Sequence, residues 1–218
     1  MNEKKSPKYF PQKLPTDQAI QKHFNKHDKA MAKIIKQVGP IQLKQNKKYF
    51  FVLCRSIISQ QISTKAADAI MARFMTLFPN QNLTPKRAHE TSNSKIREAG
   101  ISKQKSAYIK DLSDKFLNKS INPRKFQFLG NEEIIENLTQ VYGVGRWTAE
   151  MFLIFSLGRP DVFPVGDLGV RTAIKKIYKL ETLPSVRDLK SYGEKWAPFE
   201  SIGTWYAWRS LNPEIVAY

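Results

Sequence analysis

The stretch "LTQVYGVGRWTAEMF", residues 138–152, places two glycines between two apolar segments and decides the fold expected for this chain. Apolar residues before the turn fall at i, i+1, i+4 and i+7, which is one face of a helix. They are Ile134, Ile135, Leu138 and Val141. The segment after the turn, "RWTAEMFLIFSLG", also predicts a helix. We therefore expect a helix, a glycine turn and a second helix over about residues 132–157.

The turn has the form Gly-x-Gly, which also begins the dinucleotide-binding fingerprint. That fingerprint needs a preceding strand and a third glycine, but here a helical pattern precedes the turn and Thr148 holds the third position. Gly143 and Gly145 allow positive φ and a close approach of phosphate. The N–H groups at the next helix start face an anion, and Arg146 adds positive charge. Turn chemistry alone leaves two interpretations, a phosphate-binding turn and an ordinary turn between packed helices.

The same helical periodicity continues toward the N-terminus. It predicts one helix that begins at Thr16 or Asp17, either of which suits an N-cap. This helix is expected to end at Gly39-Pro40, because proline cannot continue a helix.

Most of the remaining chain also has helical spacing. Apolar residues between positions 50 and 77 predict a long helical segment with a break near residues 59–63. A short apolar piece at residues 161–165 is the one stretch that favours an extended conformation. We therefore predict an all-α, multi-helix fold.

Composition and charge narrow the class of partner. The chain has 218 residues, of which 41% are hydrophobic, enough for one domain or two small fused ones. Its 36 Lys+Arg against 19 Asp+Glu give a net charge of +17. Such a charge favours a polyanion, either nucleic acid or an anionic membrane surface. The alternative is a lysine-rich surface that is merely solvated.

Several other classes of protein do not fit this sequence. The single cysteine, Cys54, cannot form an internal disulfide or hold an iron–sulfur cluster, which takes four ligands. The longest apolar run, near residues 151–157, is too short to span a membrane. Residues 1–16 are rich in lysine and proline without an apolar stretch, so we expect a flexible basic arm before a helical domain at 17–218.

A second candidate site lies in "VFPVGDLGVRTAIKKIY", residues 162–178. Pro164 and Gly166 give an irregular approach to a helix, and Asp167 stands at the N-cap position. One interpretation is a cap alone, which contributes about 1 kcal/mol. The other is a carboxylate held at a helix start and facing a pocket.

Four motifs in order resemble the helix-hairpin-helix DNA glycosylases, most of all their 3-methyladenine DNA glycosylase II branch. The resemblance covers roughly residues 28 to 210. The motifs are "SIISQQISTKAA", "LTQVYGVGRWTAEMF", "DVFPVGDLGVR" and "WAPFESIGTWYAWR". It implies a two-lobed helix-hairpin-helix glycosylase fold. The chain before Lys29 is too short for the N-terminal β-sheet domain of some members.

The resemblance implies a monofunctional glycosylase that hydrolyses the N-glycosidic bond of alkylated purines, such as 3-methyladenine, in base excision repair. Breaking that bond builds positive charge on the sugar, and the matching position gives the catalytic carboxylate to Asp167. The target base is flipped out of the duplex into a pocket. In the branch that also cuts the strand, a lysine forms a Schiff base where Trp147 stands here, so we expect the abasic site to remain uncut.

The family's pocket positions fall on Trp147 and Trp208, and an indole face suits a positively charged alkylated purine. Core packing is the alternative for each tryptophan. Met151 and Leu168 stand where some members have aromatic pocket residues, so the substrate range is expected to differ. Glu200 stands where relatives often carry arginine.

The resemblance also assigns DNA contacts outside the pocket. Gln61, with Ile62 behind it, is the wedge that fills the gap left by the flipped base; the alternative is a polar pair facing solvent. A backbone phosphate is expected at the hairpin, on Gly143, Val144, Gly145, Arg146 and Thr148. In relatives a monovalent cation, Na+ or K+, supports this turn through carbonyls, which here are those of Thr139, Val141 and Val144. No other cofactor is expected.

The expected partner is double-stranded DNA containing damaged bases, bound by a monomer, with no membrane involved. The expected location is the cytoplasm, with the nucleoid, in a bacterium, and the nucleus in a eukaryote. Two alternatives remain open. One is a non-catalytic helix-hairpin-helix DNA-binding module. The other is a glycosylase for another damaged base, either oxidised or deaminated.

Overall fold

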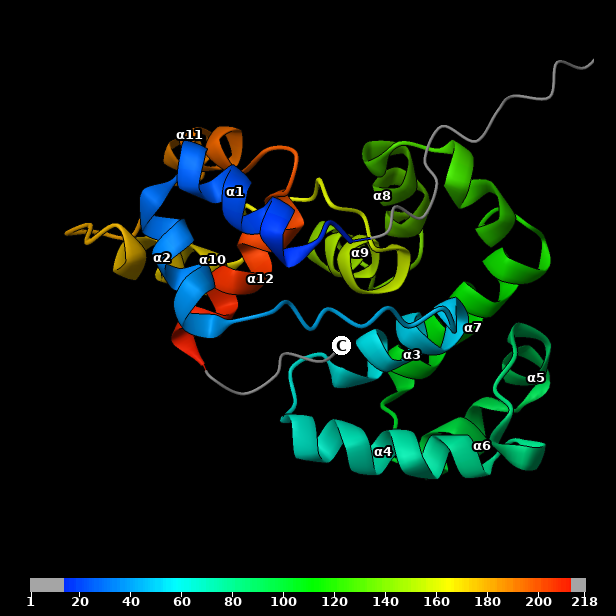
Figure 1. Ribbon diagram of the computed structural model, residues 1–218. Coiled ribbons are helices and arrows are strands. Elements are labelled where there is room, and N and C mark those ends of the chain that lie inside the picture. The colour runs from blue at the N-terminus through cyan, green and yellow to red at the C-terminus, as the bar shows by residue number, and fades with distance from the viewer. Residues whose placement is uncertain (1–13, 213–218) are drawn as a thin grey trace, which may run out of the picture. The chain divides into compact units, whose positions relative to one another are not determined.

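The computed structural model describes residues 14–212, and within that range every regular element is a helix (Figure 1). The all-α prediction is confirmed for this part of the chain. Residues 161–165, where the sequence favours an extended piece, form no strand: Asp161 is a bend, Val165 begins a turn, and residues 162–164 have no regular secondary structure. The first thirteen residues of the predicted basic arm lie outside the described range.

The chain divides into two compact units, as the two-lobed fold requires. The described part of the first unit is Asn46–Phe152, and that of the second comprises residues 14–45 and 153–212. The second unit therefore joins an N-terminal segment to the C-terminal part of the chain. Figure 1 shows this pairing: α2 packs against the red α12, and α1 packs against the orange α11.

The first unit consists of seven α-helices and two 3-10 turns within its described residues. In chain order they are α3 (Tyr49–Ser59), α4 (Thr64–Thr76), η1 (Pro79–Gln81), α5 (Pro85–Glu90), α6 (Asn93–Glu98), α7 (Lys103–Leu117), η2 (Pro123–Phe128), α8 (Asn131–Thr139) and α9 (Arg146–Phe152). An aromatic cluster fills its core, where the rings of Tyr49, Phe126 and Phe152 meet edge to face at 5.4–6.0 Å between centroids. Such pairs add to the stability gained from burial.

The core of the second unit contains two large buried side chains, Trp196 and Trp205. Its elements are α1 (Asp17–His27), α2 (Lys29–Val38), the π-helical turn η3 (Leu153–Leu157), α10 (Leu168–Ile177), α11 (Val186–Trp196) and α12 (Glu200–Leu211). Helix α12 packs against both α2 and α10, so it forms the centre of the unit.

The predicted N-terminal helix begins where the sequence indicates, because Thr16 Oγ1 accepts the N–H of Ala19. The prediction of one helix as far as Gly39 is wrong, however. Asp28 leaves the helical conformation with φ −153° and ψ 89°, and its Oδ1 accepts the N–H of Met31 at 3.0 Å. Asp28 therefore ends α1 and begins α2. Apolar periodicity misses such a break because the spacing continues across it.

The predicted break near residues 59–63 is confirmed. Helix α3 ends at Ser59 and α4 begins at Thr64, with Ser63 Oγ accepting the N–H of Ala66. The connecting loop contains Gln61 in the left-handed region at φ 58°. A non-glycine residue rarely adopts that conformation, so the loop is held in a strained shape.

The helix, glycine turn and helix predicted from the opening stretch are also confirmed. Helix α8 ends at Thr139, α9 begins at Arg146, and η3 follows α9 directly. Gly143 has φ 79°, which explains why the turn needs glycine there. The predicted start at residue 132 differs by one residue from the observed start of α8 at Asn131, and the predicted end at 157 agrees with the end of η3.

Candidate functional site

Asp167 stands at the N-cap of α10, as predicted, and only 9% of its surface is exposed. Its Oδ1 accepts two hydrogen bonds. One comes from the N–H of Val170 at 2.7 Å and the other from the indole Nε1–H of Trp208 at 2.9 Å. Because the donors come from two different helices, the carboxylate has a fixed orientation at the start of α10.

Trp208 is itself held in place by stacking. Its ring lies nearly parallel to that of Phe155, with 14° between the planes and 5.8 Å between the centroids. Gly169 makes the approach of the indole to the carboxylate sterically feasible. A Cβ there would lie 3.0 Å from Asp167 Oδ1 and 3.2 Å from Trp208 Cδ1. Leu168, beside the carboxylate in sequence, is 64% exposed, so this corner of the unit reaches the surface.

The hairpin turn of the first unit uses its two glycines for different reasons. A Cβ on Gly143 would overlap the ring of Tyr108, and the positive φ would strain any other residue there as well. A Cβ on Gly145 would meet no atom within 4 Å. No internal packing therefore requires glycine at position 145. Its missing side chain leaves the backbone accessible to an approaching group.

The positive charge of Arg146 is balanced inside the hairpin. Its guanidinium binds both carboxylate oxygens of Glu132 in α8, at 2.9 and 2.5 Å, and Glu150 one turn further along at 3.0 Å. Hydrogen bonding to Glu132 is the main cause that raises the pKa of Arg146, and it lowers the pKa of Glu132 in return. This ion pair braces α8 against α9. An anion at the turn would therefore depend mainly on backbone N–H groups.

The other predicted hairpin residues differ widely in exposure. Trp147 is 44% exposed, whereas Met151 is 1% exposed. Val144 and Thr148 are also buried. A buried Val144 and Thr148 can contribute to a phosphate site only through their backbone or by supporting the turn.

The predicted wedge lies on the loop between α3 and α4, residues 60–63, which we call the wedge loop. Gln61 is exposed and Ile62 is 38% exposed. The loop is tied down by its neighbours: Gln60 Nε2 donates to the carbonyl of Gly143 at 2.7 Å, and Lys105 Nζ donates to the carbonyls of Ile58 and Gln60 at 2.8 and 2.6 Å. These roles of Gln60 and Lys105 were not predicted from the sequence, because backbone carbonyl acceptors leave no pattern in it.

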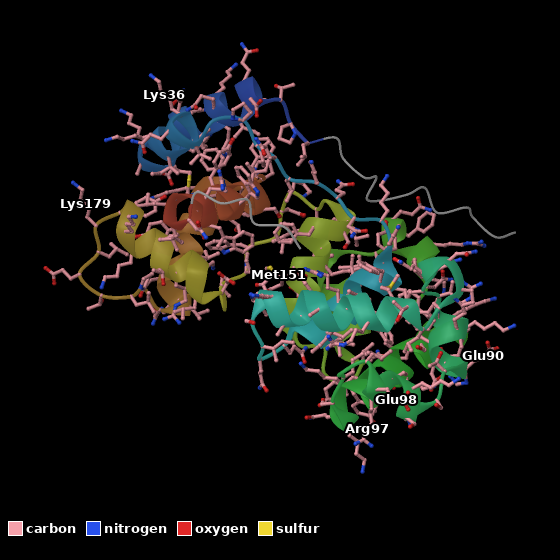
Figure 2. All side chains as sticks on the ribbon, turned by 90° about the horizontal axis from the view of Figure 1, so that it is seen from below. Lys36, Glu90, Arg97, Glu98, Met151 and Lys179 are labelled. Atoms are coloured by element: carbon pink, nitrogen blue, oxygen red, sulfur yellow. The ribbon has the colours of Figure 1, made fainter. Side chains whose placement is uncertain are left out.

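The predicted residues thus gather within each unit. Asp167, Leu168 and Trp208 share one corner of the second unit. The wedge loop and the hairpin turn share one corner of the first, where the Gln60 side chain joins them. Exposed cations occur on both units; Figure 2 shows Arg97 on the first, and Lys36 and Lys179 on the second, pointing away from the ribbon.

The three carbonyls named for a monovalent cation belong to the segment from the end of α8 to the turn. Val141 O accepts the N–H of Val144 at 3.0 Å, and a carbonyl has a second lone pair for a cation. Carbonyl oxygens are suitable ligands for a hard cation. Residues 14–212 contain no group of three or more His, Cys, Asp or Glu side chains able to hold a metal ion. In the same range, no helix is both long and apolar enough to cross a membrane.

Comparison with known proteins relates this geometry to solved structures. A structure of Schizosaccharomyces pombe 3-methyladenine DNA glycosylase (Mag1) in complex with abasic DNA superimposes with a TM-score of 0.78, 33% identity, and coverage of 88% of this chain and 96% of that one. A DNA-3-methyladenine glycosidase from Bacillus halodurans gives a TM-score of 0.82 at 32% identity, with 88% of each chain covered.

Sequence comparison leads to the same group. DNA-3-methyladenine glycosylase 1 of Schizosaccharomyces pombe is 34% identical over 193 residues, which cover 86% of this chain and 85% of that protein. Residues 54–199, which include the wedge loop, the hairpin and Asp167, match the HhH-GPD superfamily base excision DNA repair protein family. The chain therefore belongs to the HhH-GPD superfamily of base excision DNA repair proteins.

Proposed function

We propose that this chain is a monofunctional DNA glycosylase that removes alkylated purines, of the 3-methyladenine type, from double-stranded DNA. The similar proteins are named for 3-methyladenine or alkylated bases, and one of them is solved with abasic DNA. The observation that carries the proposal is the fixed orientation of Asp167 by Val170 and Trp208.

The proposed reaction breaks the bond between the sugar C1′ and the purine nitrogen. The base leaves with the electron pair of that bond, the sugar becomes positively charged, and water adds to C1′. A carboxylate in a fixed position stabilises the developing charge or takes a proton from the water. Asp167 has that role. An alkylated purine that already carries positive charge is a better leaving group, so substrate chemistry and enzyme geometry act together.

The remaining predicted residues have supporting roles in this proposal. The exposed indole of Trp147 suits a cationic base. In the second unit, Leu168 and Trp208 lie beside Asp167. Met151 is buried, so it would act only by supporting the helix that carries Trp147. Gln61 and Ile62 fill the gap in the duplex after flipping. The backbone around Gly143 and Gly145 binds a DNA phosphate, and the open space at Gly145 supports this role.

The absence of strand cleavage rests on Trp147, an indole at the hairpin position where bifunctional relatives carry the Schiff-base lysine. The carbonyls of Thr139, Val141 and Val144 would hold Na+ or K+, which would stiffen the turn without taking part in the chemistry. We further propose that the chain acts as a monomer and needs no other cofactor.

The test is base release from duplex DNA treated with a methylating agent, with each strand analysed before and after alkali. The proposal expects free 3-methyladenine and strand breaks that form only after alkali. Breaks formed without alkali would contradict the monofunctional assignment. Release from duplexes with deaminated or oxidised bases, but not from methylated DNA, would overturn the alkylpurine specificity. Binding to damaged duplex without release of any base would indicate a DNA-binding module instead.

A further inference from the structure

One helix of the first unit holds both of its predicted DNA-contacting loops. In Figure 1, α7 crosses behind α3, and the two helices pack together. The side chains of Lys105, Tyr108 and Asp111 are spaced three residues apart, so they follow one face of α7. Each of the three contacts a backbone group in one of the two loops.

Lys105 binds the backbone at the start of the wedge loop. Its ammonium group donates to the carbonyl of Ile58, in the last turn of α3, and to that of the C-cap residue Gln60, which immediately precedes Gln61. A cation at a helix C-terminus also interacts favourably with the helix dipole. Burial lowers the pKa of Lys105. These two hydrogen bonds fix the direction in which the chain leaves α3 and enters the strained conformation of Gln61.

Tyr108 and Asp111 serve the hairpin turn. The Tyr108 ring lies against the Cα of Gly143, where a side chain would overlap it. The Asp111 carboxylate accepts the N–H of Tyr142 through Oδ2 at 2.9 Å. The side chain of Gln60 then closes the arrangement, because its Nε2 donates to the carbonyl of Gly143 at 2.7 Å. The wedge loop and the hairpin turn are thus joined directly as well as through α7.

We propose that Gln60 and Lys105 are positioning residues that couple phosphate binding at the hairpin to insertion of the Gln61 wedge. The inference rests on the proposed function, because it takes Gln61 as the wedge. A phosphate bound at the turn fixes Gly143, Gly143 fixes Gln60, and Gln60 with Lys105 fixes the backbone of Gln61. Neither residue touches the reacting atoms in this account; both act through Gln61.

The chain offers a matched control on the same helix. Lys110 of α7 also has a pKa lowered by burial, and its ammonium group also donates to two backbone carbonyls, those of His89 and Thr91 at the end of α5. Replacing either lysine by methionine removes one charge and two hydrogen bonds. Only Lys105 contacts the wedge loop.

The first experiment measures DNA distortion with an abasic duplex that carries 2-aminopurine beside the abasic site, so it needs no catalysis. Lys105→Met is expected to lower the fluorescence change at saturating protein, whereas Lys110→Met is expected to keep it. Lys105→Arg, which retains donors for the same carbonyls, should restore it. Thermal denaturation monitors folding of all three variants. Equal loss in Lys105→Met and Lys110→Met would overturn the proposal.

The second experiment is a double-mutant cycle on single-turnover base release. Gln60→Ala and Gln61→Ala are each expected to reduce the rate by about tenfold, and the double variant should be no slower than Gln61→Ala, because coupled residues are not additive. Multiplied losses in the double variant would overturn the coupling. If Gln61→Ala releases base at the wild-type rate, Gln61 is not the wedge and the proposed coupling is wrong. Failure of the proposed function itself is recognised separately, because the wild-type protein then releases no base.

Discussion

The second unit contains two capping aspartates with the same kinds of hydrogen-bond donor. Asp28 caps α2 and Asp167 caps α10; each accepts a backbone N–H three residues on and the Nε1–H of a tryptophan at 2.9 Å. The carboxylates are similarly buried, at 5% and 9% exposure. Neither the cap nor the burial of the carboxylate distinguishes a structural aspartate from a catalytic candidate.

The surroundings distinguish them. The indole that binds Asp28 belongs to Trp196, which is completely buried, and the hydroxyl of Tyr178 also donates to Asp28. Burial, with Asp28 as a further cause, raises the pKa of Tyr178, so this hydroxyl remains a donor. Asp167 instead lies beside the exposed Leu168, and its indole partner Trp208 is only partly buried. Asp28 belongs to a closed core network, whereas Asp167 lies at an edge that a substrate can reach.

The largest expected effect on stability comes from Asp28→Asn. An asparagine amide has one acceptor oxygen, so its NH2 group would face either the N–H of Met31 or the donors of Tyr178 and Trp196. Breaking such a buried network costs about 2–4 kcal/mol. The free energy of unfolding from urea titration should fall by that amount, while the single-turnover rate per folded molecule stays unchanged below the transition. A normal unfolding free energy, or a lost rate in folded protein, would contradict the distinction between the two aspartates.

The paired tryptophans give the next test. Trp208→Phe keeps a ring to stack on Phe155 but loses the hydrogen bond to Asp167, so base release at saturating DNA should slow by about tenfold. Trp196→Phe loses the equivalent bond to Asp28 and should lower the melting temperature while the rate is retained. The rate of base release and the melting temperature, measured for both variants, show which tryptophan supports the reaction and which supports the fold. If base release slows in Trp196→Phe and not in Trp208→Phe, the assignment of the two tryptophans to fold and reaction is wrong.

The glycines beside the two indoles extend the comparison. Gly169→Ala places a methyl group against Asp167 Oδ1 and Trp208, which must shift by a few tenths of an ångström. Base release should slow by a few fold, although alanine improves helix propensity by about 1 kcal/mol. Gly203→Ala instead places Cβ 2.5 Å from Trp196 Cε3 and should destabilise the fold. A Gly169→Ala protein that is both faster and less stable would argue against the arrangement at Asp167.

The smallest effect concerns Glu200, a half-buried carboxylate at the start of α12. Its Oε2 is buried without a hydrogen-bond partner in the described part of the chain, and burial raises its pKa. The folded state therefore favours the protonated form more than the unfolded state does, and stability decreases as pH rises from the ordinary glutamate value of about 4.3. Glu200→Gln should gain at most about 1 kcal/mol at pH 7, with no gain at pH 4. Equal gains at both pH values would exclude protonation as the cause.

Local signals in the sequence predict much of this structure. The glycine turn, the break before Ser63 and the caps at Thr16 and Asp167 each depend on residues within a few positions, so the sequence reveals them. The break at Asp28 was missed because apolar periodicity continues across it. A polar residue with helical neighbours can lie inside a helix or interrupt it, and only the tertiary partners Trp196 and Tyr178 decide this.

For the candidate site, the sequence likewise predicted positions in local motifs but not the contacts between helices. The resemblance selects Asp167 by its position in a motif, but it does not reveal that Trp208 is the hydrogen-bond donor to Asp167. The internal neutralisation of Arg146 by Glu132 was also missed, because the two residues are on different helices. Contacts between helices and bonds to backbone carbonyls are long-range features that one sequence does not encode in a visible pattern.

The most direct test of the central claim is single-turnover release of 3-methyladenine by Asp167→Asn, measured together with its affinity for the same duplex. Asparagine keeps an oxygen that can accept from Val170 and Trp208, so the fold and the affinity should be retained. The loss of negative charge should slow release by at least about a hundredfold. An Asp167→Asn protein that binds normally and releases base at the wild-type rate would show that this carboxylate is only a helix cap.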